Sequence, residues 1–160
     1  MLTAEVADFI EGQVMILVAT RDDGHRPMIG RGSGARYDRS SRLVHVLVSQ
    51  SQWPLAVAEA LPGRPIATTF VQPDNYRSFQ IKGEIAESMA ADDAAGAWGR
   101  LYVRSQLALM QQLGVTRLQL SSTLSDRDLW HIAFRPIDVF DQTPGPGAGR
   151  RLTAPAETAA

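Results

Sequence analysis

The sequence carries six short strand-like segments separated by turn signals, and this succession limits the folds open to the chain. Each segment is rich in apolar or β-branched residues and is bounded by Gly, Pro, Asn or Asp. Short strands at hairpin spacing favour a mainly β, antiparallel barrel over a sheet made of strand–helix–strand units. The expected strands are residues 14–20, 27–37, 42–49, 65–72, 76–87 and 129–140.

Three helices are expected before and between these strands. Residues 3–11 have Thr3 as an N-cap candidate and Gly12 as a stop signal, and residues 51–61 hold one or two helical turns. Residues 90–113 form the long helix. Its predicted apolar stripe consists of Ala94, Trp98, Leu101, Leu107 and Met110.

The length of 160 residues suits one domain with a substantial core. We expect this domain to cover residues 1–142. From residue 143 the composition shifts to Pro, Gly and Ala, so residues 143–160 are expected to form a tail that is either disordered or held against another surface. Two alternatives stay open for Arg150 and Arg151, which are either solvated or contact an anionic ligand.

The first expected strand, "VMILVAT", is a continuous apolar run rather than an alternating one. Such a run is typical of a strand that is buried on both faces. The third strand, "RLVHVLVS", is apolar in the same way. Because a single barrel needs only one buried face per strand, the two strands predict a homodimer with a large apolar interface.

Composition excludes several classes of function. The formal net charge of −1 leaves no basic surplus for nucleic-acid binding. The absence of cysteine excludes disulfides, cysteine-ligated metal centres and cysteine nucleophiles. The sequence has neither a signal-peptide pattern nor an apolar run long enough to span a membrane, so we expect a cytoplasmic protein with no membrane partner.

Glycine alternates with other residues in "PMIGRGSGARY", where Gly30, Gly32 and Gly34 share one face of the expected strand. The spacing fits neither a P-loop nor a dinucleotide-binding fingerprint. Two interpretations stay open: the strand bends or crosses another strand closely, or a ligand or a partner backbone lies on the bare face. In either case Gly32→Val is expected to be more damaging than Ser33→Val.

The stretch "SQSQWP" precedes the short helix and has an unusual start. Pro54 is expected at the first helical position, which leaves Trp53 where a capping side chain belongs. The first-turn N–H groups then need another partner. Either Ser49 and Ser51 supply it, or an anion does.

Other polar residues give weaker signals. In "YRSFQIKGEI" the alternation indicates a half-buried strand, and Arg77 and Lys82 taken alone are solvated. The three histidines, His25, His45 and His131, have no spacing typical of metal ligands, so no metal site is expected.

Together, the order of the elements and four local stretches resemble the pyridoxamine 5′-phosphate oxidase-like family of FMN-binding split barrels. The stretches are "VATRDDGHRPMIGRGSGARYD", "LVHVLVSQSQW", "YRSFQIKGEI" and "LWHIAFRPIDVFDQ". The resemblance runs from about Gly12 to Phe140, and it rests on the order and spacing of these stretches.

The resemblance implies a six-stranded antiparallel split β-barrel that forms a homodimer and binds FMN in a groove between two subunits. It implies that basic and polar side chains on the strands and on the turn before the short helix contact the cofactor. The implied cofactor-binding residues are Arg31, Ser33, Arg36, Ser49, Ser51, Gln52, Trp53, Gln80, Lys82 and Trp130.

The chain departs from the family pattern at several positions. Trp53 and the pair Ala35–Arg36 stand where the family usually has lysine, and no histidine follows Arg150 and Arg151. Oxidation of pyridoxamine phosphate is therefore not expected. The leading hypothesis is an FMN-dependent oxidoreductase acting on a small organic or nicotinamide substrate. The alternatives are a non-catalytic binder of flavin, haem or deazaflavin, and a structural dimer without a ligand.

Overall fold

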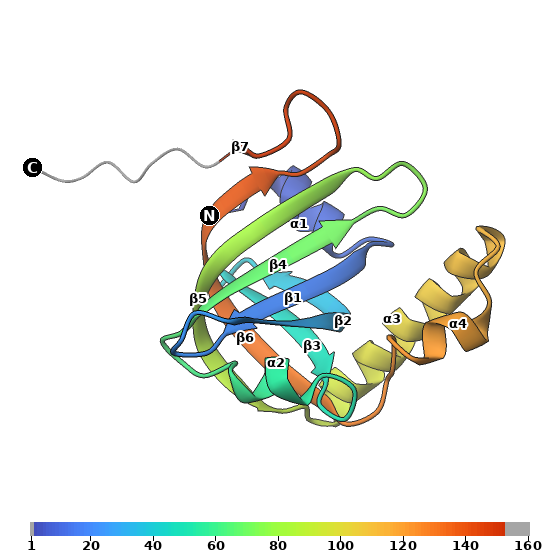
Figure 1. The fold of residues 1–160 in the computed structure, drawn as a ribbon, viewed down its shortest axis with the longest axis horizontal. Coiled ribbons are helices and arrows are strands. Elements are labelled where there is room, and N and C mark those ends of the chain that lie inside the picture. Colours follow the sequence, from blue (N-terminus) through green and yellow to red (C-terminus); the bar gives the residue numbers. More distant parts are fainter. Residues whose placement is uncertain (1, 153–160) are drawn as a thin grey trace, which may run out of the picture.

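A computed structural model describes residues 2–152 and shows a closed antiparallel barrel with helices against its outside (Figure 1). Six strands follow one another in the order β3-β2-β1-β4-β5-β6, and pairing of β3 with β6 closes the barrel. The six-stranded antiparallel split barrel predicted from the sequence is therefore confirmed. The strands are β1 (Met15–Arg21), β2 (Pro27–Asp38), β3 (Leu43–Ser49), β4 (Pro65–Val71), β5 (Ser78–Ala90) and β6 (Leu129–Asp141).

Four helices occupy the described residues: α1 (Ala4–Ile10), α2 (Pro54–Ala58), α3 (Asp93–Gln112) and α4 (Arg117–Ser121). The first begins as predicted, because the Thr3 side chain accepts a hydrogen bond from the Val6 N–H. The second has Pro54 at its start and no side-chain cap from Trp53, also as predicted. Helix α3 packs against β2 and β6 around Gly99, and its C-terminal part extends away from the barrel beside α4 (Figure 1). None of the helices in residues 2–152 is long and apolar enough to span a membrane.

Inward-facing side chains of the six strands form the core, and Phe70, Ile81 and Phe134 are among those with no exposed surface. The expectation that β1 is buried on both faces is wrong for the single chain. Its burial alternates, so that Ile16 and Val18 are fully buried whereas Leu17 is 41% exposed. The sequence of β1 is continuously apolar because its outward-facing residues are apolar too. In the single chain these outward-facing side chains are partly exposed.

The glycines of β2 lie against side chains of the same chain. A Cβ on Gly30 would contact Trp53, and one on Gly32 would lie 2.5 Å from Ile16 Cγ2. A register shift between Gly32 and Ala35 lies in this stretch, and a Cβ on Gly34 would meet the Trp98 ring of α3. The expectation that the three glycines share one face is therefore wrong, because the register shift turns Gly34 toward α3 while Gly32 faces the barrel interior. Close packing, the first of the two interpretations, explains the glycines.

The expected apolar stripe of α3 is wrong. Leu101 is 62% exposed, whereas Gly99, Val103 and Gln106 are buried. A Cβ on Gly99 would clash with Leu129, so the helix crosses the barrel at its smallest residue. The face of α3 that carries Gly99 points inward because only a glycine lets the helix axis approach the strands so closely.

The residues after β6 turn back along the strand. A two-residue strand, β7 (Arg150–Arg151), pairs with Phe140 and Asp141 of β6. Arg150 forms an ion pair with Asp141 at 3.8 Å, and Arg151 forms one with Asp138. The two tail arginines thus contact carboxylates of their own chain, and residues 153–160 lie outside the described range.

Candidate functional site

The segment of residues 121–125, here called the covering segment, brings together four of the residues implied as cofactor contacts. Arg31 Nη1 donates to Thr123 Oγ1 at 3.1 Å, and Ser33 Oγ donates to the Ser125 carbonyl at 2.6 Å. Gln52 Nε2 donates to the Ser121 carbonyl at 2.9 Å, and Trp53 Nε1 donates to that of Thr123 at 3.4 Å. The covering segment therefore joins β2 to the turn before α2.

Arg31 is the most unusual member of this cluster. Its side chain is only 8% exposed, yet its Nε and Nη2 atoms have no hydrogen-bond partner. Burial lowers the pKa of the guanidinium, and the Tyr102 hydroxyl opposes this more weakly. A buried cation without a carboxylate partner is costly, and these two covered donors lack the acceptor that an anion would supply.

Hydroxyl groups stand on the turn between β3 and α2. Ser49 is fully buried, and its Oγ lies 3.2 Å from Ser51 Oγ. The two serines bond each other and do not cap α2. The Trp53 N–H donates to the Ser49 carbonyl at 2.9 Å, which holds the turn closed.

The pairing register places Gln80 on the same outer face of the barrel as Arg31. Arg31 stands opposite Leu17, Leu17 opposite Thr69, and Thr69 opposite Gln80. Directly paired residues point to the same side of a sheet, and three steps between strands span about 14 Å. The outer face of β2, β1, β4 and β5 thus carries Arg31 at one edge and Gln80 at the other.

A second row on this face ends at Lys82, which stands opposite Ala67 and, through it, Ala19 and Ile29. The Lys82 ammonium lies 4.9 Å from the centre of the Phe140 ring. Gln80 Nε2 donates to Thr69 Oγ1 at 3.1 Å. Both side chains therefore have contacts within the chain and remain next to the open face.

Arg36 and Trp130 lie apart from this face. The Arg36 guanidinium stacks over the Trp98 ring at 4.5 Å, near the outer end of β2. Trp130 Nε1 donates to Ser88 Oγ at 2.8 Å, and the ring lines a cavity that Ser51 also lines. In the described chain, these two residues do not join Arg31.

Two of the three histidines lie together, although their spacing in the sequence gave no sign of it. His45 Nδ1 and His131 Nε2 are 2.9 Å apart on the paired strands β3 and β6. Burial lowers the pKa of both rings. Residues 2–152 contain no group of three or more His, Cys, Asp or Glu side chains placed to hold a metal ion.

Sequence reasoning missed Thr123 and Ser125, which complete the cluster around Arg31. It also missed α4, which precedes them. A signal was available, because Thr116 and Gln119 form a capping box at the start of α4. The polar stretch "SSTLSDRD", residues 121–128, has no periodic pattern that would mark it.

No protein-family model matches the chain, and no curated protein matches it either. Solved structures do. A protein described as an F420 reductase has 15% sequence identity and a TM-score of 0.51, with 82% of this chain and 93% of that one covered. HupZ of Group A Streptococcus has 19% identity and a TM-score of 0.51, with 93% and 100% covered.

A pyridoxamine 5′-phosphate oxidase-related, FMN-binding protein from Nostoc punctiforme also matches, with 13% identity and a TM-score of 0.44 over 84% of this chain and 77% of that one. At these identities the matches concern the fold. The chain has the split-barrel fold that the sequence predicted, so the resemblance stated from the sequence is confirmed at the level of the fold.

Proposed function

We propose that this protein binds a phosphorylated flavin or deazaflavin, with FMN as the first candidate, on the outer face of β2, β1, β4 and β5. The observation that carries the proposal is Arg31, whose buried guanidinium has two nitrogen atoms without a partner. A guanidinium fork binds phosphate through paired, charge-assisted hydrogen bonds. The matching folds include a protein described as an F420 reductase and another described as FMN-binding.

The remaining contacts follow from the geometry around Arg31. The phosphate would lie at Arg31, with the Thr123 hydroxyl as a further donor. The ring system would extend along the row toward Gln80, since the bare outer face between them carries Leu17 and Thr69. Once bound, the cofactor would supply hydride chemistry for an oxidoreductase, while the protein orients it and excludes water.

Titration of the full-length protein with FMN, followed by flavin fluorescence, tests the phosphate contact. Arg31→Met is expected to weaken FMN binding by roughly 10- to 100-fold, because a hydrogen bond to a charged group contributes about 1.5–3 kcal/mol. Arg135→Met is the matched control, since Arg135 is exposed and has no ion pair in the described structure. Equal FMN affinities for the two variants, or no binding by the unaltered chain, would contradict the proposal.

We further propose that two copies pair through this outer face and so enclose the cofactor. Leu17 is 41% and Ile29 is 62% exposed, and both lie on the face that carries Arg31. A paired copy would remove these apolar side chains from water.

Sedimentation of the full chain at micromolar concentration is expected to give a dimer. The Leu17→Asp/Ile29→Asp double variant is expected to give a monomer that binds FMN more weakly. The control is Leu118→Asp, which changes an 83% exposed leucine on α4. A monomeric unaltered chain would exclude this arrangement.

A further inference from the structure

A second group of arginines surrounds a cavity of about 680 Å³ between α3, α4 and the loop that precedes β6. Arg100, Arg104, Arg117 and Arg127 all line it, and Asp126 is the one acidic residue in its wall. None of the four arginines has an ion pair within residues 2–152. The cavity is therefore strongly positive, although the chain as a whole has a formal net charge of −1.

Of the other eleven arginines, six form ion pairs with aspartate or glutamate: Arg26, Arg39, Arg64, Arg77, Arg150 and Arg151. Like charges that converge on a shared cavity repel one another and favour the binding of anions. The clustering of unpaired guanidinium groups thus marks this cavity out from the rest of the surface.

The length of the cavity and the apolar part of its wall indicate what kind of ligand fits it. Arg100, Arg104, Leu107 and Gln111 recur at helical spacing on one face of α3, over a length of about 16 Å. Leu107 and Leu124 give the wall an apolar part, next to the guanidinium groups. A single small anion would leave most of this length unfilled.

We propose that the cavity binds an elongated ligand that carries two or more phosphate or carboxylate groups joined to an apolar part. The anionic groups contact the arginines of α3 and α4, and the apolar part lies against Leu107 and Leu124. The site is separate from the Arg31 cluster and does not depend on the cofactor proposed there.

The two sites share a wall. Ser121 and Ser125 of the covering segment line the cavity, while their carbonyl oxygens accept hydrogen bonds from Gln52 and Ser33 of the other site. A ligand in the cavity therefore contacts the segment that closes over Arg31.

Calorimetric titration of the full-length protein with pyrophosphate tests the anionic part. The double variant Arg104→Gln/Arg117→Gln is expected to weaken pyrophosphate binding at least tenfold. The double variant Arg42→Gln/Arg135→Gln removes two exposed arginines that lie outside the cavity, and it is expected to leave pyrophosphate affinity unchanged. If both double variants lost the same pyrophosphate affinity, the loss would come from the lower net charge alone. That result would overturn the proposal.

Two further measurements separate this site from its alternatives. A loss of pyrophosphate affinity in Arg31→Met with none in Arg104→Gln/Arg117→Gln would assign the anion to Arg31 instead and overturn the proposal. Sedimentation of the cavity variant is expected to match that of the unaltered chain. A changed mass with unchanged pyrophosphate affinity would make the arginines a contact between subunits and overturn the proposal.

Hexyl diphosphate tests the apolar part of the ligand. It is expected to bind at least tenfold more tightly than pyrophosphate, because its alkyl chain is removed from water against the two leucines. Leu107→Ser is expected to abolish this gain while leaving pyrophosphate affinity unchanged. Equal affinities of the unaltered chain for the two probes would overturn the apolar half of the proposal.

Discussion

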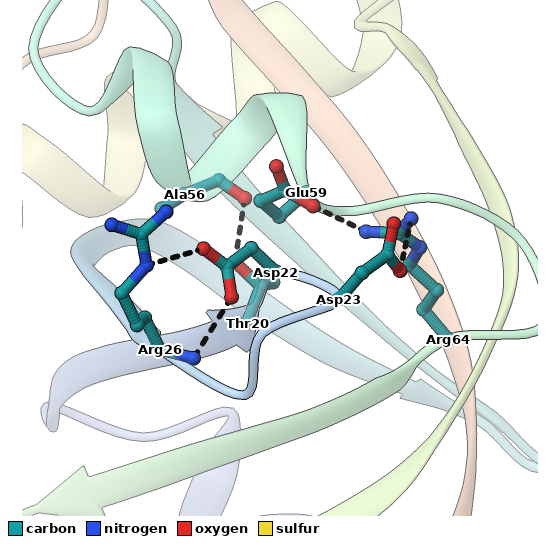
Figure 2. A network of polar contacts seen from close by, with 7 residues as sticks. All are labelled: Thr20, Asp22, Asp23, Arg26, Ala56, Glu59 and Arg64. Atoms are coloured by element: carbon teal, nitrogen blue, oxygen red, sulfur yellow. Dashed lines mark hydrogen bonds and ion pairs between the residues drawn. The ribbon is translucent and has the colours of Figure 1, made fainter.

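Arginines are paired differently in the β1–β2 hairpin and in the middle of β2. At the β1–β2 hairpin, Arg26 donates to Asp22 through its Nε at 2.7 Å and through its backbone N–H at 2.9 Å. Nearby, Arg64 forms ion pairs with Glu59 and, at 2.9 Å, with Asp23 (Figure 2). Further along the strand, Arg31 is more deeply buried and has only a hydroxyl partner.

The difference separates arginines that hold the fold from arginines that are free to bind. The Arg64–Asp23 pair ties the β1–β2 turn to the loop after α2, and Asp22, Asp23 and Glu59 each meet a cation (Figure 2). The charge of Arg31 gains nothing comparable from its surroundings, so it contributes little to stability as the chain stands. A position that is costly for folding is expected where a ligand supplies the missing partner.

Gly32→Val, on the strand that carries Arg31, is expected to cause the largest loss in the free energy of unfolding. A Cβ there would lie 2.5 Å from Ile16 Cγ2 and 2.8 Å from Ile16 Cβ, inside the packed barrel. The free energy of unfolding is expected to fall by roughly 3 kcal/mol, the upper end of the usual cost of overpacking. Urea denaturation measures it.

Ser33→Val is the comparison for this change. It removes the hydrogen bond from Ser33 Oγ to the Ser125 carbonyl, which costs about 1 kcal/mol. Propensity alone favours valine in a strand at both positions. If Ser33→Val proved as damaging as Gly32→Val, the close packing of β2 on β1 would not be the dominant constraint.

Replacing each kind of arginine by methionine gives the next largest difference. Arg64→Met is expected to lower the free energy of unfolding by about 1 kcal/mol, because it breaks two partly exposed ion pairs. Arg31→Met is expected to raise it by about 1 kcal/mol, since an apolar side chain relieves the burial of a poorly paired charge. Thermal unfolding of the two variants without added ligand tests this, and a loss of stability in Arg31→Met would remove the distinction.

Sequence patterns predicted the barrel because its strands are local features with their own turn signals. The turn residues that bound the strands, the start of α2 at Pro54 and the strand at residues 129–140 all follow from residues within a few positions of one another. The occupant of the glycine face did not follow in this way. Trp53, Ile16 and Trp98 reach Gly30, Gly32 and Gly34 from three different elements, and only the folded chain brings them together.

The candidate site likewise has residues that the sequence predicted and contacts that only the folded chain shows. Arg31, Ser33, Gln52 and Trp53 were named from the family resemblance, and the chain does bring them together. What the sequence could not provide is the segment that joins them, which lies about ninety residues further on at Thr123 and Ser125. The unpaired state of Arg31 was equally hidden, because it depends on which carboxylates are absent from its folded surroundings.

Asp22→Asn is expected to have the smallest effect, and its pH dependence identifies its cause. Hydrogen bonds from the Arg26 backbone and side chain hold the pKa of Asp22 below its usual value. A carboxyl whose pKa is lowered on folding stabilises the native state above its unfolded pKa of about 3.9, and this contribution is lost as pH falls through the folded pKa. Asp22→Asn is therefore expected to melt slightly below the unaltered chain at pH 7, and the gap should narrow as pH falls from about 4 toward 2. A gap that stays constant down to pH 2 would show that the loss comes from replacing an acceptor oxygen with an amide group and not from the charge.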